Sequence, residues 1–111
     1  LSYEATTVVI ASASDTNSTG TIVVKKDSTT EHILVEFYDE NGHYFQPEYP
    51  LHQLQTFLGN MNLAEIHTET NEPWVIQVKG IQAGNTTIVL RLIVSGSSEF
   101  DSYPITINVL P

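Results

Sequence analysis

The alternation of apolar and polar residues is the feature that most constrains the fold of this chain. In Thr86–Val94, for example, every second side chain is a large aliphatic one. Successive side chains of a β-strand point to opposite faces, so this period predicts strands that bury one face. The ranges with this pattern are Thr21–Lys25, His32–Tyr38, Leu63–Glu69, Trp74–Lys79, Thr86–Val94 and Tyr103–Leu110.

Turn-forming residues separate these ranges at nearly regular intervals. Asn41-Gly42 is the strongest short hairpin signal in the chain, and Ser95–Ser102 is predicted to be a flexible loop. Leu51–Leu58 fits a helix face as well as a strand, and the strands around it favour a strand. The sequence therefore predicts an all-β protein: an Ig-like antiparallel β-sandwich of about seven or eight strands, with an extended N-terminal strand.

The segment Ala5–Ser14, with sequence ATTVVIASAS, precedes this regular pattern and is nearly uncharged on both faces. A strand without a polar face is usually buried on both sides. Ser14–Gly20 is polar and is interpreted as a flexible tether. We therefore divide the chain into residues 1–20, an N-terminal strand with its tether, and residues 21–111, the sandwich.

Two geometries would bury the N-terminal strand. It can fold back as the first strand of its own sandwich, or it can complete the sheet of a neighbouring copy, as in donor-strand complementation. The second contact is head-to-tail, does not close, and would propagate as a filament of identical subunits. We expect this exchanged arrangement, a homo-oligomer whose assembly strand consists of Thr6, Thr7, Val8, Val9, Ile10 and Ala11.

The charge and cysteine content exclude several partners and sites. The formal net charge is −9, from thirteen acidic and four basic residues, and the chain has no cysteine. Nucleic-acid binding relies on clustered Lys and Arg, so nucleic acid is not an expected partner. No run reaches the roughly 18 apolar residues of a membrane span. The absence of disulfides, the Thr-rich composition and the sequons at Asn17 and Asn85 favour a prokaryotic extracellular or cell-surface glycoprotein, with a periplasmic location as the alternative.

Candidate chemistry is sparse. Glu65, His67 and Glu69 alternate along one strand face, where an imidazole between two carboxylates could hold a divalent cation; a solvated strand face explains the same pattern. No cofactor is expected apart from such a cation. No catalytic motif is present, and a sandwich of this size is expected to offer little concave volume for a substrate. Four aromatic residues cluster near the Asn-Gly turn, namely Tyr38, Tyr44, Phe45 and Tyr49.

The C-terminal half resembles a known family. The stretch KGIQAGNTTIVLRLIVSGSSEFDSYPITINV is similar to the closing hairpin of bacterial Ig-like domains, with its A-G-x-T turn and its final P-I-x-x-x-V strand. HILVEFYDENGHYFQP resembles a hairpin found in secreted or lipid-anchored members of these domains. The match spans roughly Thr21 to Val109 and implies an extracytoplasmic, non-catalytic module.

Together these observations predict a non-enzymatic extracellular structural module that self-assembles into a surface polymer or filament through its N-terminal strand. The alternative is a monomeric periplasmic or surface Ig-like domain that binds a divalent metal or another ligand. The two hypotheses differ in the expected oligomeric state and in the expected response to metal.

Overall fold

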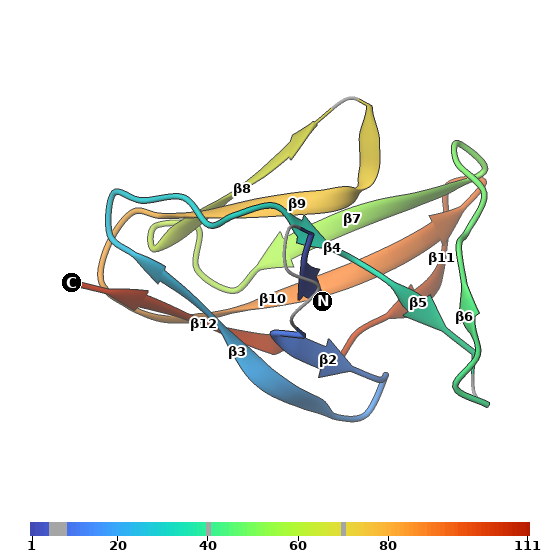
Figure 1. Ribbon diagram of the computed structural model, residues 1–111, viewed down its shortest axis with the longest axis horizontal. Helices are drawn as coiled ribbons and strands as arrows, with labels where there is room; N and C mark the ends of the chain where they lie inside the picture. The colour runs from blue at the N-terminus through green and yellow to red at the C-terminus, as the bar shows by residue number, and fades with distance from the viewer. Residues whose placement is uncertain (5–8, 40, 70) are drawn as a thin grey trace.

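The chain forms a sandwich of two main β-sheets, and the prediction of an all-β sandwich is confirmed (Figure 1). The computed structural model describes residues 1–4, 9–39, 41–69 and 71–111. The smaller main sheet has the order β1 (Ser2–Tyr3), β4 (Ile33–Leu34), β9 (Glu72–Gly80) and β8 (Ala64–Glu69). The larger sheet has the order β11 (Ser97–Asp101), β10 (Gly84–Val94), β12 (Ile105–Leu110), β3 (Ser18–Lys25) and β2 (Ala11–Ala13), with β7 (His52–Leu58) also paired to β10. A separate hairpin pairs β5 (Phe37–Tyr38) with β6 (Tyr44–Phe45).

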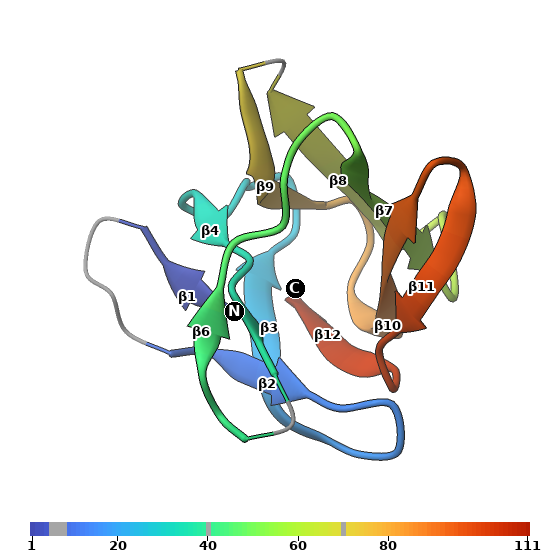
Figure 2. The same cartoon turned by 90° about the vertical axis from the view of Figure 1, so that its right-hand side faces the viewer.

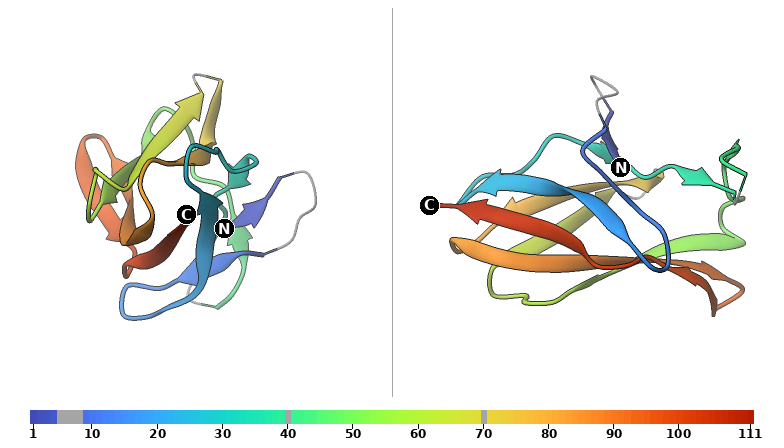
Figure 3. Two further views of the ribbon diagram at one scale, coloured as in Figure 1. Left: turned by 90° about the vertical axis from the view of Figure 1, so that its left-hand side faces the viewer. Right: turned by 90° about the horizontal axis from the view of Figure 1, so that it is seen from below.

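The larger sheet joins the beginning and the end of the chain. β3 and β12 run parallel, from Thr21 opposite Thr106 to Lys25 opposite Leu110. Parallel neighbours need a long connection, and here the whole middle of the sandwich provides it. The view from below shows β3, β12 and β10 side by side (Figure 3). The other named strand pairs are antiparallel.

The core lies between the two sheets and follows the alternation in the sequence. In β10, Ile88, Leu90 and Leu92 are buried, as their spacing predicts. Trp74 is also buried, at the start of β9. The largest fully buried side chains are branched aliphatic ones, which suit a pleated surface: Ile22, Ile33, Ile76, Val78, Ile88, Ile105, Ile107 and Val109.

The strands are more numerous than predicted, with twelve in the part of the chain that the structure describes. His32–Tyr38 was expected to be one strand, but it divides into β4 in the smaller sheet and β5 in the separate hairpin. Leu51–Leu58 does form a strand, because β7 pairs with β10 from His52 opposite Val94 to Leu58 opposite Ile88.

Two segments expected to be irregular contain strands. The predicted loop Ser95–Ser102 holds β11, because Ser95 and Gly96 form a tight turn with positive φ angles of 49° and 84°. A two-residue turn with two positive φ angles matches the twist of a hairpin. The predicted tether Ser14–Gly20 is a hairpin loop, and its last three residues already belong to β3.

Candidate functional site

The predicted assembly strand lies only partly within the described residues. Thr6, Thr7 and Val8 fall outside them. Val9 forms an isolated bridge with Ser2, and 70% of its surface is exposed. Ile10 donates its backbone N–H to the carbonyl oxygen of Leu1 at 2.9 Å, and Ala11 begins β2 and is buried.

The described part of this segment contacts its own chain through β2 and β3. Ala11 lies opposite Gly20, and Ser12 lies opposite Thr19 with their hydroxyl oxygens 3.0 Å apart. Gly20 has φ +83°, and a Cβ atom there would overlap the carbonyl oxygen of Ile10. The close approach of the two backbones therefore requires glycine at position 20. Sequence reasoning missed this role because no local motif marks it.

The N-terminal segment contributes an edge strand to each main sheet. β1 ends the order of the smaller sheet, and β2 ends the order of the larger one. Both are short, with two and three residues. Figure 2 shows β1 and β2 on the same side of the molecule. An edge strand has one side free of ladder partners, which makes it the natural place for pairing with another chain.

A groove of about 560 Å³ opens between the layers near this edge, which corrects the expectation of little concave volume. After β4 the chain leaves the smaller sheet. The separate β5–β6 hairpin therefore lines the groove where the smaller sheet does not reach. Ser12 and Ala13 of the N-terminal segment border the groove. The rest of the lining is mostly apolar and includes Val35, Phe37, Phe45, Leu54, Leu90, Leu92, Phe100 and Ile105.

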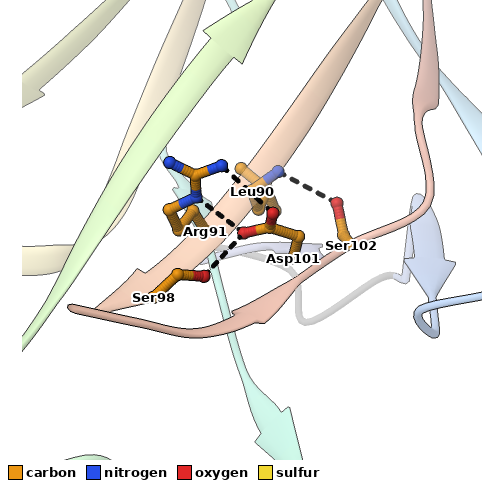
Figure 4. Close-up of polar contacts among 5 residues, drawn as sticks. All are labelled: Leu90, Arg91, Ser98, Asp101 and Ser102. Carbon is orange, nitrogen blue, oxygen red and sulfur yellow. Dashed lines mark hydrogen bonds and ion pairs between the residues drawn. The ribbon is translucent and has the colours of Figure 1, made fainter. Parts of the chain in front are cut away.

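Polar contacts hold β11 against β10 beside this groove (Figure 4). Arg91 donates two hydrogen bonds to the carboxylate of Asp101, at 2.7 and 3.1 Å, and Ser98 donates a third at 3.1 Å. The backbone N–H of Leu90 donates to the hydroxyl oxygen of buried Ser102 at 2.9 Å. The hydrogen bond from Arg91 lowers the pKa of Asp101, and the same bond raises the pKa of Arg91.

The four aromatic residues predicted to cluster near the Asn-Gly turn are all exposed, namely Tyr38, Tyr44, Phe45 and Tyr49. Phe37 packs edge-on against Trp74, with ring centroids 5.4 Å apart, and attaches the hairpin to the core. Tyr38 and Tyr44 contact each other at 5.8 Å and remain more than half exposed. Tyr49 is also exposed.

The predicted metal-ligating residues are brought together only in part. His67 Nε2 lies 3.2 Å from Glu65 Oε2, whereas the carboxylate of Glu69 lies 3.4 Å from Nε2 of His32. An uninterrupted β8–β9 ladder would place Glu69 opposite Val75, but the register shifts after Thr68 and places Glu69 opposite Glu72. Ligand atoms of His32, Glu69 and Glu72 all lie within 4.8 Å of one another.

Sequence reasoning missed His32 because it is remote in sequence from Glu69, and it missed Glu72 because only the register shift after Thr68 places Glu72 opposite Glu69. The connection between His32 and Glu69 comes from strand order: β4 pairs with β9, and β9 pairs with β8. Each of the four histidines lies next to a carboxylate, and the four pairs are His32–Glu69, His43–Asp39, His52–Glu99 and His67–Glu65.

The two sequon asparagines are both exposed. Asn17 lies in the loop between β2 and β3, where its backbone carbonyl accepts a hydrogen bond from Ser14. Asn85 lies near the start of β10, opposite Asn108 of β12. Their glycosylation stays a prediction. In the described part of the chain, no helix is long and apolar enough to cross a membrane.

Comparison with known proteins identifies a shared fold. No protein-family model matches the sequence, and no curated protein matches it significantly. A similar solved structure is the crystal structure of the S-layer protein SbsC domains 4 and 5, with a TM-score of 0.58 and 16% sequence identity. The match covers 94% of this chain and 51% of the other, so this chain spans about half the length of that structure. At this identity the likeness defines the fold class alone: a β-sandwich also found in an S-layer protein.

Proposed function

We propose that this chain is a non-enzymatic structural module of the cell surface, which assembles with further copies of itself through its N-terminal segment. The observation that carries the proposal is the fold likeness to S-layer protein domains over 94% of the chain. The negative net charge, the absence of cysteine and the two exposed sequon asparagines support an extracellular location, with Asn17 and Asn85 as glycan acceptors.

The contacts of the N-terminal segment support assembly by strand exchange. Residues 11–13 pair with β3, and Ser2 and Tyr3 pair with β4, so one short segment adds an edge to both sheets. The same pairings made to β3 and β4 of a neighbouring copy would use identical contacts. An exchange of this kind therefore needs no new interface chemistry, and the exposed side chain of Val9 would gain burial from any further contact.

A cysteine-pair experiment tests this assembly directly, because the natural chain has no cysteine. Ser12 and Thr19 are exposed and lie opposite each other, one in the N-terminal segment and one in β3. The double variant Ser12→Cys/Thr19→Cys, oxidised at high concentration, is expected to give a ladder of covalent oligomers on a non-reducing gel. If the segment is exchanged, the disulfide between positions 12 and 19 links two different chains. If the segment folds back, the same disulfide forms within one chain.

The matched control is Asn85→Cys/Asn108→Cys, a cross-strand pair within the body of the larger sheet. This control is expected to form disulfides within single chains and to run as a monomer. A monomer band for both variants, together with a monomeric mass for the natural chain by light scattering, would show that the N-terminal segment stays with its own copy. The assembly proposal would then be wrong.

A further inference from the structure

We propose that His32, Glu69 and Glu72 form a binding site for a divalent transition-metal ion of the zinc class. The site lies on the smaller sheet, where the β8–β9 hairpin projects beyond the rest of the sandwich (Figure 2). It differs from the surface proposed for assembly, which uses β1 and β2. The metal-site proposal and the assembly proposal can therefore be tested, and refuted, independently of each other.

Three separate elements bring the ligands together. His32 precedes β4, and its carbonyl oxygen accepts a hydrogen bond from the backbone N–H of Glu4 at 2.9 Å. Glu69 ends β8, and Glu72 begins β9. Pairing of β4 with β9 and of β9 with β8 holds these backbones in place. The imidazole thus comes from a segment remote in sequence from the hairpin that supplies both carboxylates.

The ligand distances suit a small tetrahedral ion. Ligands about 2.0–2.1 Å from a tetrahedral zinc ion lie about 3.3–3.4 Å from one another. His32 Nε2 and Glu69 Oε1 are already 3.4 Å apart. All three ligand atoms lie within 4.8 Å, so a movement of about 1.5 Å by the Glu72 side chain would complete three corners of the tetrahedron. Solvent would supply the fourth.

The local charge favours a bound cation. Glu69 and Glu72 lie directly opposite each other across the hairpin, and like charges in this position are destabilising. The basic residues lie elsewhere: Arg91 binds Asp101, Lys79 lies opposite Glu65 further along the ladder, and Lys25 and Lys26 lie beside Gly80 at the far end of β9. An imidazole beside two carboxylates favours zinc or copper over calcium and magnesium, which prefer oxygen ligands alone.

The neighbouring pair of Glu65 and His67 provides an internal comparison. Its two groups are 3.2 Å apart and lie on the same strand, β8. Within the residues that the structure describes, only His32, Glu69 and Glu72 form a group of three such ligands. A third ligand adds greatly to affinity, so the two clusters should differ sharply in zinc binding.

Calorimetric titration of the full chain with zinc chloride near neutral pH tests the site. We expect one bound ion per chain for the natural protein. His32→Asn and Glu72→Gln should each weaken binding by about 100-fold or more, because loss of even an outer contact of a metal site costs about 10- to 100-fold. Glu65→Gln and His67→Asn, the matched controls, should bind like the natural chain. Circular dichroism melting of each metal-free variant verifies folding.

The ring signals of His32 provide a second readout that does not depend on the variants. Zinc should shift the ring nitrogen resonances of His32 in NMR spectra and leave those of His67 in place. The proposal is wrong if the folded natural chain produces no heat with zinc. It is also wrong if the binding follows Glu65 and His67, or if calcium binds as tightly as zinc.

Discussion

The two ends of the sandwich differ in how completely they bury their apolar side chains. At the end where β3, β9, β10 and β12 converge, long strands with matched registers enclose Ile22, Ile107 and Val109 completely (Figure 1). At the other end, the two-residue strands β5 and β6 and the N-terminal segment border a groove. Apolar side chains face inward at both ends, but only the first end is closed.

This difference shows what alternation in sequence can and cannot accomplish. An alternating strand always presents an apolar face, but burial requires a second layer that extends equally far. The smaller sheet does not extend over the groove, because β4 has only two residues and the chain then forms the separate β5–β6 hairpin. Leu90 and Leu92 therefore belong to the core and also line an open cavity.

The largest expected effect lies at the closed end. Ile22 is fully buried and Val23, its neighbour in β3, is 44% exposed. Ile22→Ala should lower the free energy of unfolding by about 2–5 kcal/mol, because it leaves a cavity between two rigid sheets. Val23→Ala, the matched control, should cost less than about 1 kcal/mol. Urea denaturation measures both, and equal losses would contradict the assignment of β3 faces.

An intermediate effect is expected where the N-terminal segment pairs with β3. Gly20→Ala should cost about 2 kcal/mol, because its φ is positive and its Cβ would overlap the backbone of Ile10. Gly42 has nearly the same φ, +80°, and open space around it. Gly42→Ala should therefore cost only about 1 kcal/mol, the price of the positive φ alone. If the two variants melt together in thermal denaturation, β2 does not pack on β3 as described.

The smallest effect is expected at the open end, at the exposed pair of Arg91 and Asp101. The pKa of Asp101 is lower in the folded state than in the unfolded state, so its contribution to stability is present above the unfolded value of about 3.9. That contribution is lost as the pH falls through the folded-state pKa. The natural chain should therefore melt slightly above Asp101→Asn near neutral pH.

The pH dependence of this difference is the decisive measurement. The difference in melting temperature should shrink as the pH is lowered below about 4. A difference that persists unchanged in strong acid would mean that the variant acts through packing of β11 and not through charge. Glu31→Gln, at an exposed position without an ion pair among the described residues, serves as the charge-matched control.

Several elements were predictable because their signals are local. The inward faces of β10 and β12 follow from every-second-residue spacing, and the Asn41-Gly42 turn marks the β5–β6 hairpin. The Ser95-Gly96 turn was equally local, but the polar residues after it concealed β11, which is held through Asp101. The edge strands β1 and β2 have only two and three residues, too few for alternation to reveal them.

The sequence by itself determined the class of fold, because a period of two can bury its apolar face only in sheets. It also determined the acidic, cysteine-free surface. The tertiary structure alone decided which strands are neighbours, and so it brought Gly20 against Ile10 and placed His32 beside Glu69. The physical reason is that strand order and register depend on contacts between distant segments, which local spacing does not encode.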